Sequence, residues 1–215
     1  MHYIANFTRA GGVVAVMLLA IMPAAAHAFT VTIAAGSPKE IYLQVGVGSF
    51  TGHLDTGGTP QNNTTINTAS VSVAAASVGN GVAQTMTTDS TASASFWDGY
   101  AFCNAPAQLY IGGFYRSTTN GSNVATLTAT VPAALVDAAG DQLSFATISW
   151  GSAGNGDTGS EPFAAGTFVK GGVQTIGVIA QNQWAESCWT FRYANSTVPP
   201  QGTYAGTVLF TMTAP

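Results

Sequence analysis

Short runs in which apolar and polar residues alternate follow one another from residue 29 to the end of the chain. Alternation with a period of two places every second side chain on one face of an extended backbone, which is typical of half-buried β-strands. Gly, Pro and Asn residues separate the runs and predict turns. The runs are 29–33, 41–47, 65–73, 96–103, 108–115, 124–131, 142–150, 173–180, 188–194 and 203–213. This pattern predicts an all-β fold, either an immunoglobulin-like or a jelly-roll-like antiparallel β-sandwich.

Two further expectations concern local structure. Residues 133–139 (AALVDAA) are the sole helix candidate, with room for a turn or two. The runs 188–195 and 203–213 flank the turn residues Pro199, Pro200 and Gly202, and they predict a closing antiparallel hairpin. Because no change in composition marks a boundary, we expect residues 29–215 to form a single domain.

Residues 1–28 differ from the rest of the chain. Arg9 precedes the apolar run 11–22, which ends before the small-residue sequence Ala26-His27-Ala28. This order predicts a secretory signal peptide that is cleaved after Ala28. The run is shorter than the ~20 residues that span a bilayer, although a retained anchor is the alternative. We therefore expect an exported protein, in the periplasm, at the cell surface or released, with no membrane insertion after cleavage.

The chain contains two cysteines, Cys103 and Cys188. In an exported protein such a pair predicts one disulfide, and a catalytic thiol is the alternative. The bridge would tie an early strand to a late one, which gives a β-sandwich with one disulfide.

Charged residues are scarce and make up 7% of the chain, with a formal net charge of −4. The absence of a basic stripe argues against nucleic acid and against an anionic membrane surface as partners. A polar but nearly uncharged surface offers little repulsion to copies of the same chain, to related subunits or to neutral glycans. Many exported β-proteins have such a surface without any of these partners.

The closing segment 202–215 reads GTYAGTVLFTMTAP. It resembles the final strand of bacterial exported immunoglobulin-like proteins, namely chaperone–usher pilins and spore-coat-U-like domains. The matching residues are Gly202, Thr203, Tyr204, Thr207 and Val208. Two features depart from the pilin pattern: Cys103 lies far from the mature N-terminus, and the chain ends in Ala214-Pro215 without an aromatic residue next to last.

The resemblance implies a sandwich that is completed by a strand from a neighbouring subunit. Phe29, Val31 and Ile33 at the new N-terminus are the candidate donor strand. The alternative is that residues 29–33 form the first strand of the chain's own sandwich.

The residues with catalytic potential are few and scattered. His53 is the single histidine after the predicted cleavage site, and no G-x-S-x-G sequence accompanies it. Asp98 and Glu186 are carboxylates with aromatic neighbours, but a hydrolase needs two such groups across a cleft. We therefore expect no enzyme activity and no cofactor.

A weak calcium candidate lies in the Gly-rich loop that follows residue 150. Asn155, Asp157 and Glu161 offer oxygen ligands there at alternating or nearby positions. The loop lacks the spacing of an EF-hand, so an ordinary polar turn is the alternative. No other metal site is expected.

Aromatic residues are the remaining candidates for binding. Aromatic rings stack on the apolar face of a sugar ring, and the candidate glycan contacts are Trp97, Tyr100, Trp184 and Trp189. Tryptophans beside a disulfide also fill the cores of sandwiches, which is the alternative. The sequence thus predicts an exported structural or adhesive protein, such as a fimbrial-type subunit acting through protein contacts. The second hypothesis is a secreted carbohydrate-binding module.

Overall fold

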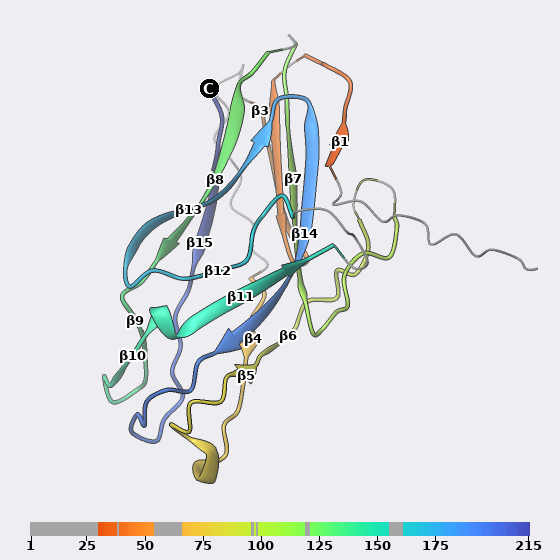
Figure 1. Ribbon diagram of the computed structural model, residues 1–215. Helices are drawn as coiled ribbons and strands as arrows, with labels where there is room; N and C mark the ends of the chain where they lie inside the picture. The colour runs from red at the N-terminus through yellow and green to blue at the C-terminus, as the bar shows by residue number, and fades with distance from the viewer. Residues whose placement is uncertain are drawn as a thin grey trace, which may run out of the picture.

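The computed structural model (Figure 1) describes residues 30–37, 39–53, 66–95, 97, 99–118, 121–154 and 161–215. The predicted signal peptide 1–28 and Phe29 lie outside the described residues. The regular elements are strands and two short 3-10 helices. In chain order they are β1 (Thr30–Thr32), β2 (Glu40–Val45), β3 (Gly48–His53), β4 (Ala69–Ser70), η1 (Ala75–Ser77), β5 (Gln84–Thr85), β6 (Thr87–Thr88), β7 (Leu109–Arg116), β8 (Val124–Val131), β9 (Ala134–Val136), β10 (Gln142–Ser144), η2 (Phe145–Thr147), β11 (Ile148–Ala153), β12 (Gly166–Thr167), β13 (Gly172–Ala180), β14 (Gln183–Tyr193) and β15 (Leu209–Thr213).

Two antiparallel sheets form the body of the fold. The larger sheet has the strand order β12-β11-β14-β7-β2-β3, and β1 and β5 also pair with β14. The smaller sheet has the order β13-β8-β15 and lies beside β7 and β14 in Figure 1. One hydrophobic core contains residues from both sheets. The fold is therefore an all-β sandwich, as the alternating pattern predicts.

Strand β8 shows how the alternation builds this core. Ala125, Leu127, Ala129 and Val131 are buried, whereas the threonines between them point away from the core. On the facing sheet Trp189 stacks on Trp150 with 4.9 Å between ring centroids. Burying one face of each strand is the main favourable contribution to such a fold.

Strand β14 is the centre of the large sheet. Its first half pairs with β7 on one edge and β1 on the other. Its second half pairs with β11 and with β5. Both edges of β14 are thus occupied along most of its length.

The predicted closing hairpin is wrong. Strand β15 pairs with β8 in the smaller sheet, with Met212 opposite Leu127, and not with β14. The physical reason is that β14 already has neighbours on both edges. Residues 194–208 therefore lead from one sheet to the other.

The helix expected at residues 133–139 is also wrong. Ala134–Val136 is strand β9 and pairs with β10. The chain then turns at Asp137, whose carboxylate accepts hydrogen bonds from the backbone N–H groups of Ala139 and Asp141. A carboxylate that satisfies local N–H groups favours a turn over a helix.

Candidate functional site

The outer face of the large sheet is covered, and the candidate site is built there. Trp184, Glu186 and Cys188 are alternate residues of β14, so they share this face, and all three side chains are fully buried. Tyr110 of β7 and Tyr42 of β2 belong to the same cluster, which is separate from the main core. Ala92, Phe102 and Cys103 pack over this outer cluster, and Val31 of β1 packs against it from the neighbouring strand.

Aromatic contacts hold the outer cluster together. The ring of Trp184 lies 5.6 Å from that of Tyr42 and 6.0 Å from that of Phe114, measured between centroids. Such distances are within the range of favourable aromatic pairs. Val31 of β1 packs against the cluster, and Ile33 is buried in it.

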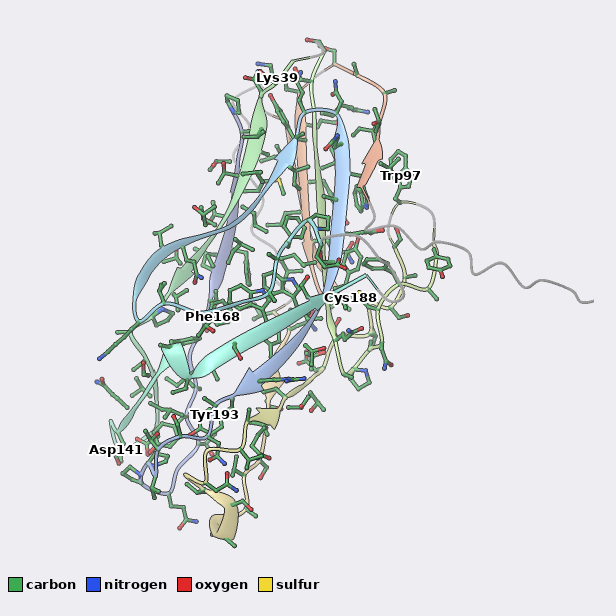
Figure 2. All side chains as sticks on the ribbon, viewed as in Figure 1. Lys39, Trp97, Asp141, Phe168, Cys188 and Tyr193 are labelled. Carbon is green, nitrogen blue, oxygen red and sulfur yellow. A yellow bond between two sulfur atoms is a disulfide. The ribbon has the colours of Figure 1, made fainter. Side chains whose placement is uncertain are left out.

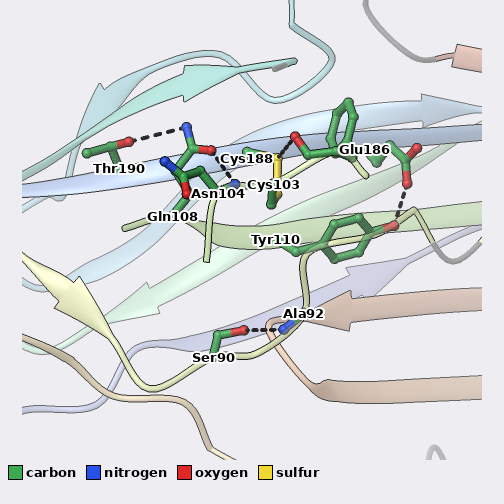
Figure 3. Close-up of a disulfide and its surroundings, with 10 residues drawn as sticks. Ser90, Ala92, Cys103, Asn104, Gln108, Tyr110, Glu186, Cys188 and Thr190 are labelled. Carbon is green, nitrogen blue, oxygen red and sulfur yellow. Dashed lines mark hydrogen bonds between the residues drawn. A yellow bond between two sulfur atoms is a disulfide. The ribbon is translucent and has the colours of Figure 1, made fainter. Parts of the chain in front are cut away.

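The disulfide fixes the cover to the sheet. Cys103 and Cys188 are bonded, with 5.4 Å between their Cα atoms, as the sequence predicts (Figure 3). Cys188 belongs to β14, whereas Cys103 belongs to the loop that lies over it. The bridge therefore connects segments that are 85 residues apart.

A buried carboxyl group lies under this cover. The Tyr110 hydroxyl donates a hydrogen bond of 2.5 Å to Oε2 of Glu186 (Figure 3). Gly112 is opposite Glu186 in β7, and a Cβ atom there would lie 2.4 Å from the Tyr110 hydroxyl oxygen. Glycine thus leaves the space that the phenol needs to reach the carboxylate. This pair stabilises a polar group that would be costly to bury alone.

Replacing Tyr110 by Phe should lower the free energy of unfolding by about 2 kcal/mol, because Glu186 would lose a buried hydrogen-bond donor. Urea denaturation measures the change. Tyr115→Phe is the matched control, since Tyr115 is also buried but belongs to the main core and not to the cluster around Glu186. Equal losses in the two variants would contradict the role assigned to the Tyr110–Glu186 bond.

The cover ends in a hairpin within residues 93–103, of which 93–95, 97 and 99–103 are described. The backbone N–H groups of Phe102 and Cys103 donate to the carbonyl of Ser93, and the N–H of Ser95 donates to the carbonyl of Tyr100. Near the tip, Trp97 is 47% exposed and Tyr100 is 60% exposed (Figure 2 labels Trp97). Trp97 also contacts Trp184, with 6.1 Å between centroids. The hairpin therefore presents two aromatic side chains on a base that is anchored by the disulfide.

The four aromatic candidates from the sequence do not form one surface. Trp184 and Trp189 are both 0% exposed and belong to different clusters. Neither presents a ring face to solvent, so a glycan hypothesis depends on Trp97 and Tyr100. The Tyr110–Glu186 pair was not predicted, although a glutamate two residues before a bridged cysteine places it on the covered face.

The candidate donor strand lies within the chain's own sheet. Val31 is in β1 and is opposite Trp184, and the N–H of Ile33 donates to the carbonyl of Asn182 at 2.8 Å. Phe29 is outside the described residues. The structure thus shows residues 30–32 as the first strand of the chain's own sandwich.

The calcium candidate lies mostly outside the described residues. Asn155 and Asp157 are not described, and Glu161 is half-buried. Among the residues that the structure describes, no group of three or more His, Cys, Asp or Glu side chains could hold a metal ion. The same part of the chain contains no helix with the length and apolar character needed to cross a membrane.

Two features of this face can make contacts, namely the strand pairing at β1 and the exposed aromatic rings near the hairpin tip. Comparison with protein-family models, with curated proteins and with solved structures finds no match for the chain.

Proposed function

We propose that this protein is an exported structural or adhesive subunit that associates with copies of itself or with related subunits by exchanging its N-terminal strand. The observation that carries the proposal is the position of β1. This three-residue strand fills an edge of β14, and its Val31 packs against the outer aromatic cluster. The disulfide is compatible with an oxidising, exported location.

Strand β1 can be exchanged without disturbing the rest of the fold. It is the first described element, and within the described residues it pairs with β14 alone. Residues 33–39 separate it from β2. If β1 moved to the β14 strand of a neighbour, Val31 and Ile33 would make the same contacts there, so little free energy separates the two arrangements.

The geometry of such an exchange sets the type of assembly. Each subunit would donate one strand and accept another at a different place on its surface, which is a head-to-tail contact. Contacts of this kind build open chains when the rotation between subunits does not close a ring. A nearly uncharged surface adds little repulsion between neighbours.

The test uses the chain 29–215 and a truncated chain 35–215. The truncated chain should have a lower melting temperature, because the β14 edge loses its partner strand and the aromatic cluster loses its contact with Val31. A synthetic peptide of residues 29–36 should restore stability, by about 2.7 kcal/mol at 100 times its Kd. The control peptide carries Val31→Asp and Ile33→Asp, which place charges against the aromatic cluster, and it should have no effect.

Light scattering then reports assembly. The chain 29–215 should form oligomers as its concentration rises, whereas the chain 35–215 should remain monomeric. If both chains stay monomeric at every concentration, or if the peptide 29–36 does not bind, the strand-exchange proposal fails.

A second candidate function is binding of neutral glycans through Trp97 and Tyr100. The observation that favours it is the exposure of two aromatic side chains on a hairpin whose base is bonded to β14. A fixed aromatic surface can stack on the apolar face of a sugar ring with little loss of conformational entropy.

A further inference from the structure

A depression of about 360 Å³ lies beside the base of hairpin 93–103. Most of its exposed surface is apolar and includes Ala105 and Pro106, and hydroxyl groups and one carboxylate supply the polar remainder. The polar lining residues are Thr88, Asp89, Ser90, Thr91 and Ser93. No Lys or Arg belongs to the lining, so the depression favours a ligand without negative charge.

Hydrogen bonds to one oxygen of the Asp89 carboxylate hold this side chain in place. Oδ1 accepts hydrogen bonds from the Asn67 side chain and from the N–H of Thr68. These two bonds stabilise the charged form and hold the pKa of Asp89 below its usual value. Asn67 is itself fixed by the N–H of Val47, which donates to its Oδ1. Asp89 is exposed, so its carboxylate can also accept a hydrogen bond from a ligand hydroxyl.

Two of the hydroxyls are structural and two are available. The Thr88 hydroxyl donates to the carbonyl of Pro106, and the Ser90 hydroxyl accepts from the N–H of Ala92 (Figure 3). Thr91 and Ser93 are exposed, and their hydroxyls make no hydrogen bond within the described part of the chain. The hydrogen bonds of Thr88 and Ser90 therefore fix the backbone, while the hydroxyls of Thr91 and Ser93 face solvent. Such preorganisation lowers the entropic cost of binding.

The depression and the aromatic tip belong to the same segment. Ser93 lines the depression and also begins the hairpin that carries Trp97. Four residues of extended chain span about 13 Å at most, which limits the distance between the two features along the hairpin. A short, extended ligand can therefore reach both.

We propose that the depression and the hairpin tip form one extended site for a short stretch of neutral glycan. Trp97 and Tyr100 would stack on a sugar ring, while Asp89, Thr91 and Ser93 would hydrogen-bond the hydroxyls of a ring further along. This inference rests on the glycan-binding candidate and adds to it the second subsite and the length of the ligand.

The test measures binding of the chain 29–215 to neutral hexasaccharides by isothermal titration calorimetry. The probes are cellohexaose, xylohexaose, laminarihexaose and maltohexaose. Trp97→Ala should reduce the affinity at least tenfold, because the stacking surface is lost. Thr91→Val removes one hydroxyl at nearly constant shape and should reduce the affinity about three- to tenfold, as should Asp89→Asn. Thr213→Val, an exposed threonine of β15 on the smaller sheet, is the matched control and should bind as the unaltered chain does.

The possible results distinguish failure of the second subsite from failure of glycan binding as a whole. If Trp97→Ala weakens binding while Thr91→Val and Asp89→Asn leave it unchanged, the glycan-binding candidate stands and the second subsite is overturned. The subsite is also overturned if the matching disaccharide binds as tightly as the hexasaccharide. If the unaltered chain binds none of the four probes, both the glycan-binding candidate and the extended site are rejected. The melting temperature of each variant shows whether a loss comes from unfolding.

Discussion

The double variant Cys103→Ala, Cys188→Ala is expected to unfold with a free energy about 4 kcal/mol lower than that of the unaltered chain. The bridge closes a loop of 85 residues, and a long loop loses much of its freedom in the unfolded state when it is cross-linked. It also holds the cover of Glu186 and Trp184 against the sheet. Guanidinium denaturation under non-reducing conditions measures the difference.

Reduction gives the control for this prediction. The unaltered chain with excess reductant should become as unstable as the double variant, whereas the double variant should not respond to reductant. A loss below about 1 kcal/mol would mean that the cover is held by the aromatic contacts and not by the bridge.

A chain that ends at Val208 should not fold. The deletion removes β15, so Met212 leaves the core and Phe210 leaves its contact with Trp189, where the centroids are 5.9 Å apart. Large side chains lost from a core cost about 2–5 kcal/mol each, and β8 also loses one of its two neighbours. The sum approaches the entire stability of a typical domain, about 5–15 kcal/mol.

Near-ultraviolet circular dichroism and urea denaturation test this expectation. The truncated chain should lack the tertiary signal of Trp189 and a cooperative transition. Deleting Pro215 alone is the control and should change little, because this residue is exposed. A cooperative transition in the truncated chain would show that the smaller sheet is stable without β15.

The sequence was most informative for strands that have one buried face. The run 124–131 coincides with β8, because its threonines alternate with buried Ala, Leu and Val. Strand β14 was predicted to begin at residue 188, but it begins at Gln183. Residues 184–189 are buried on both faces of the sheet, and each face has one polar residue, Glu186 or Ser187, so the segment shows no alternation of apolar and polar residues.

The alternation of apolar and polar residues does not predict which strands pair with one another. Residues 203–213 have a strand-like pattern, yet nothing local distinguishes β14 from β8 as the neighbour of β15. That choice depends on which edges the rest of the chain has already filled. The same limit applies to the predicted strand 96–103, whose described residues 97 and 99–103 belong to a hairpin with one bridge between Ala94 and Ala101 and not to a strand of the sheet.

For the candidate site, the cysteine pair was predictable and its surroundings were only partly so. Trp184 and Trp189 are five positions apart on one strand, an odd number, so they must lie on opposite faces and cannot serve one ligand. The exposure of Trp97 depends on the hairpin that carries it, and the bond between Tyr110 and Glu186 depends on the register of β7 with β14.

The position of β14 also determines the order in which the molecule can be completed. Its partners come from residues 30–32, 84–85, 109–116 and 148–153, so the large sheet joins segments from almost the whole length of the chain. During synthesis the N-terminus appears first. The four partner segments are therefore made before β14, their shared neighbour, which is complete only when residue 193 has been added. Sheets dominated by such distant pairings form slowly, in milliseconds to seconds. The chain therefore spends its synthesis in an incompletely folded state, with β1 and the partners of β14 open to pairing with another molecule.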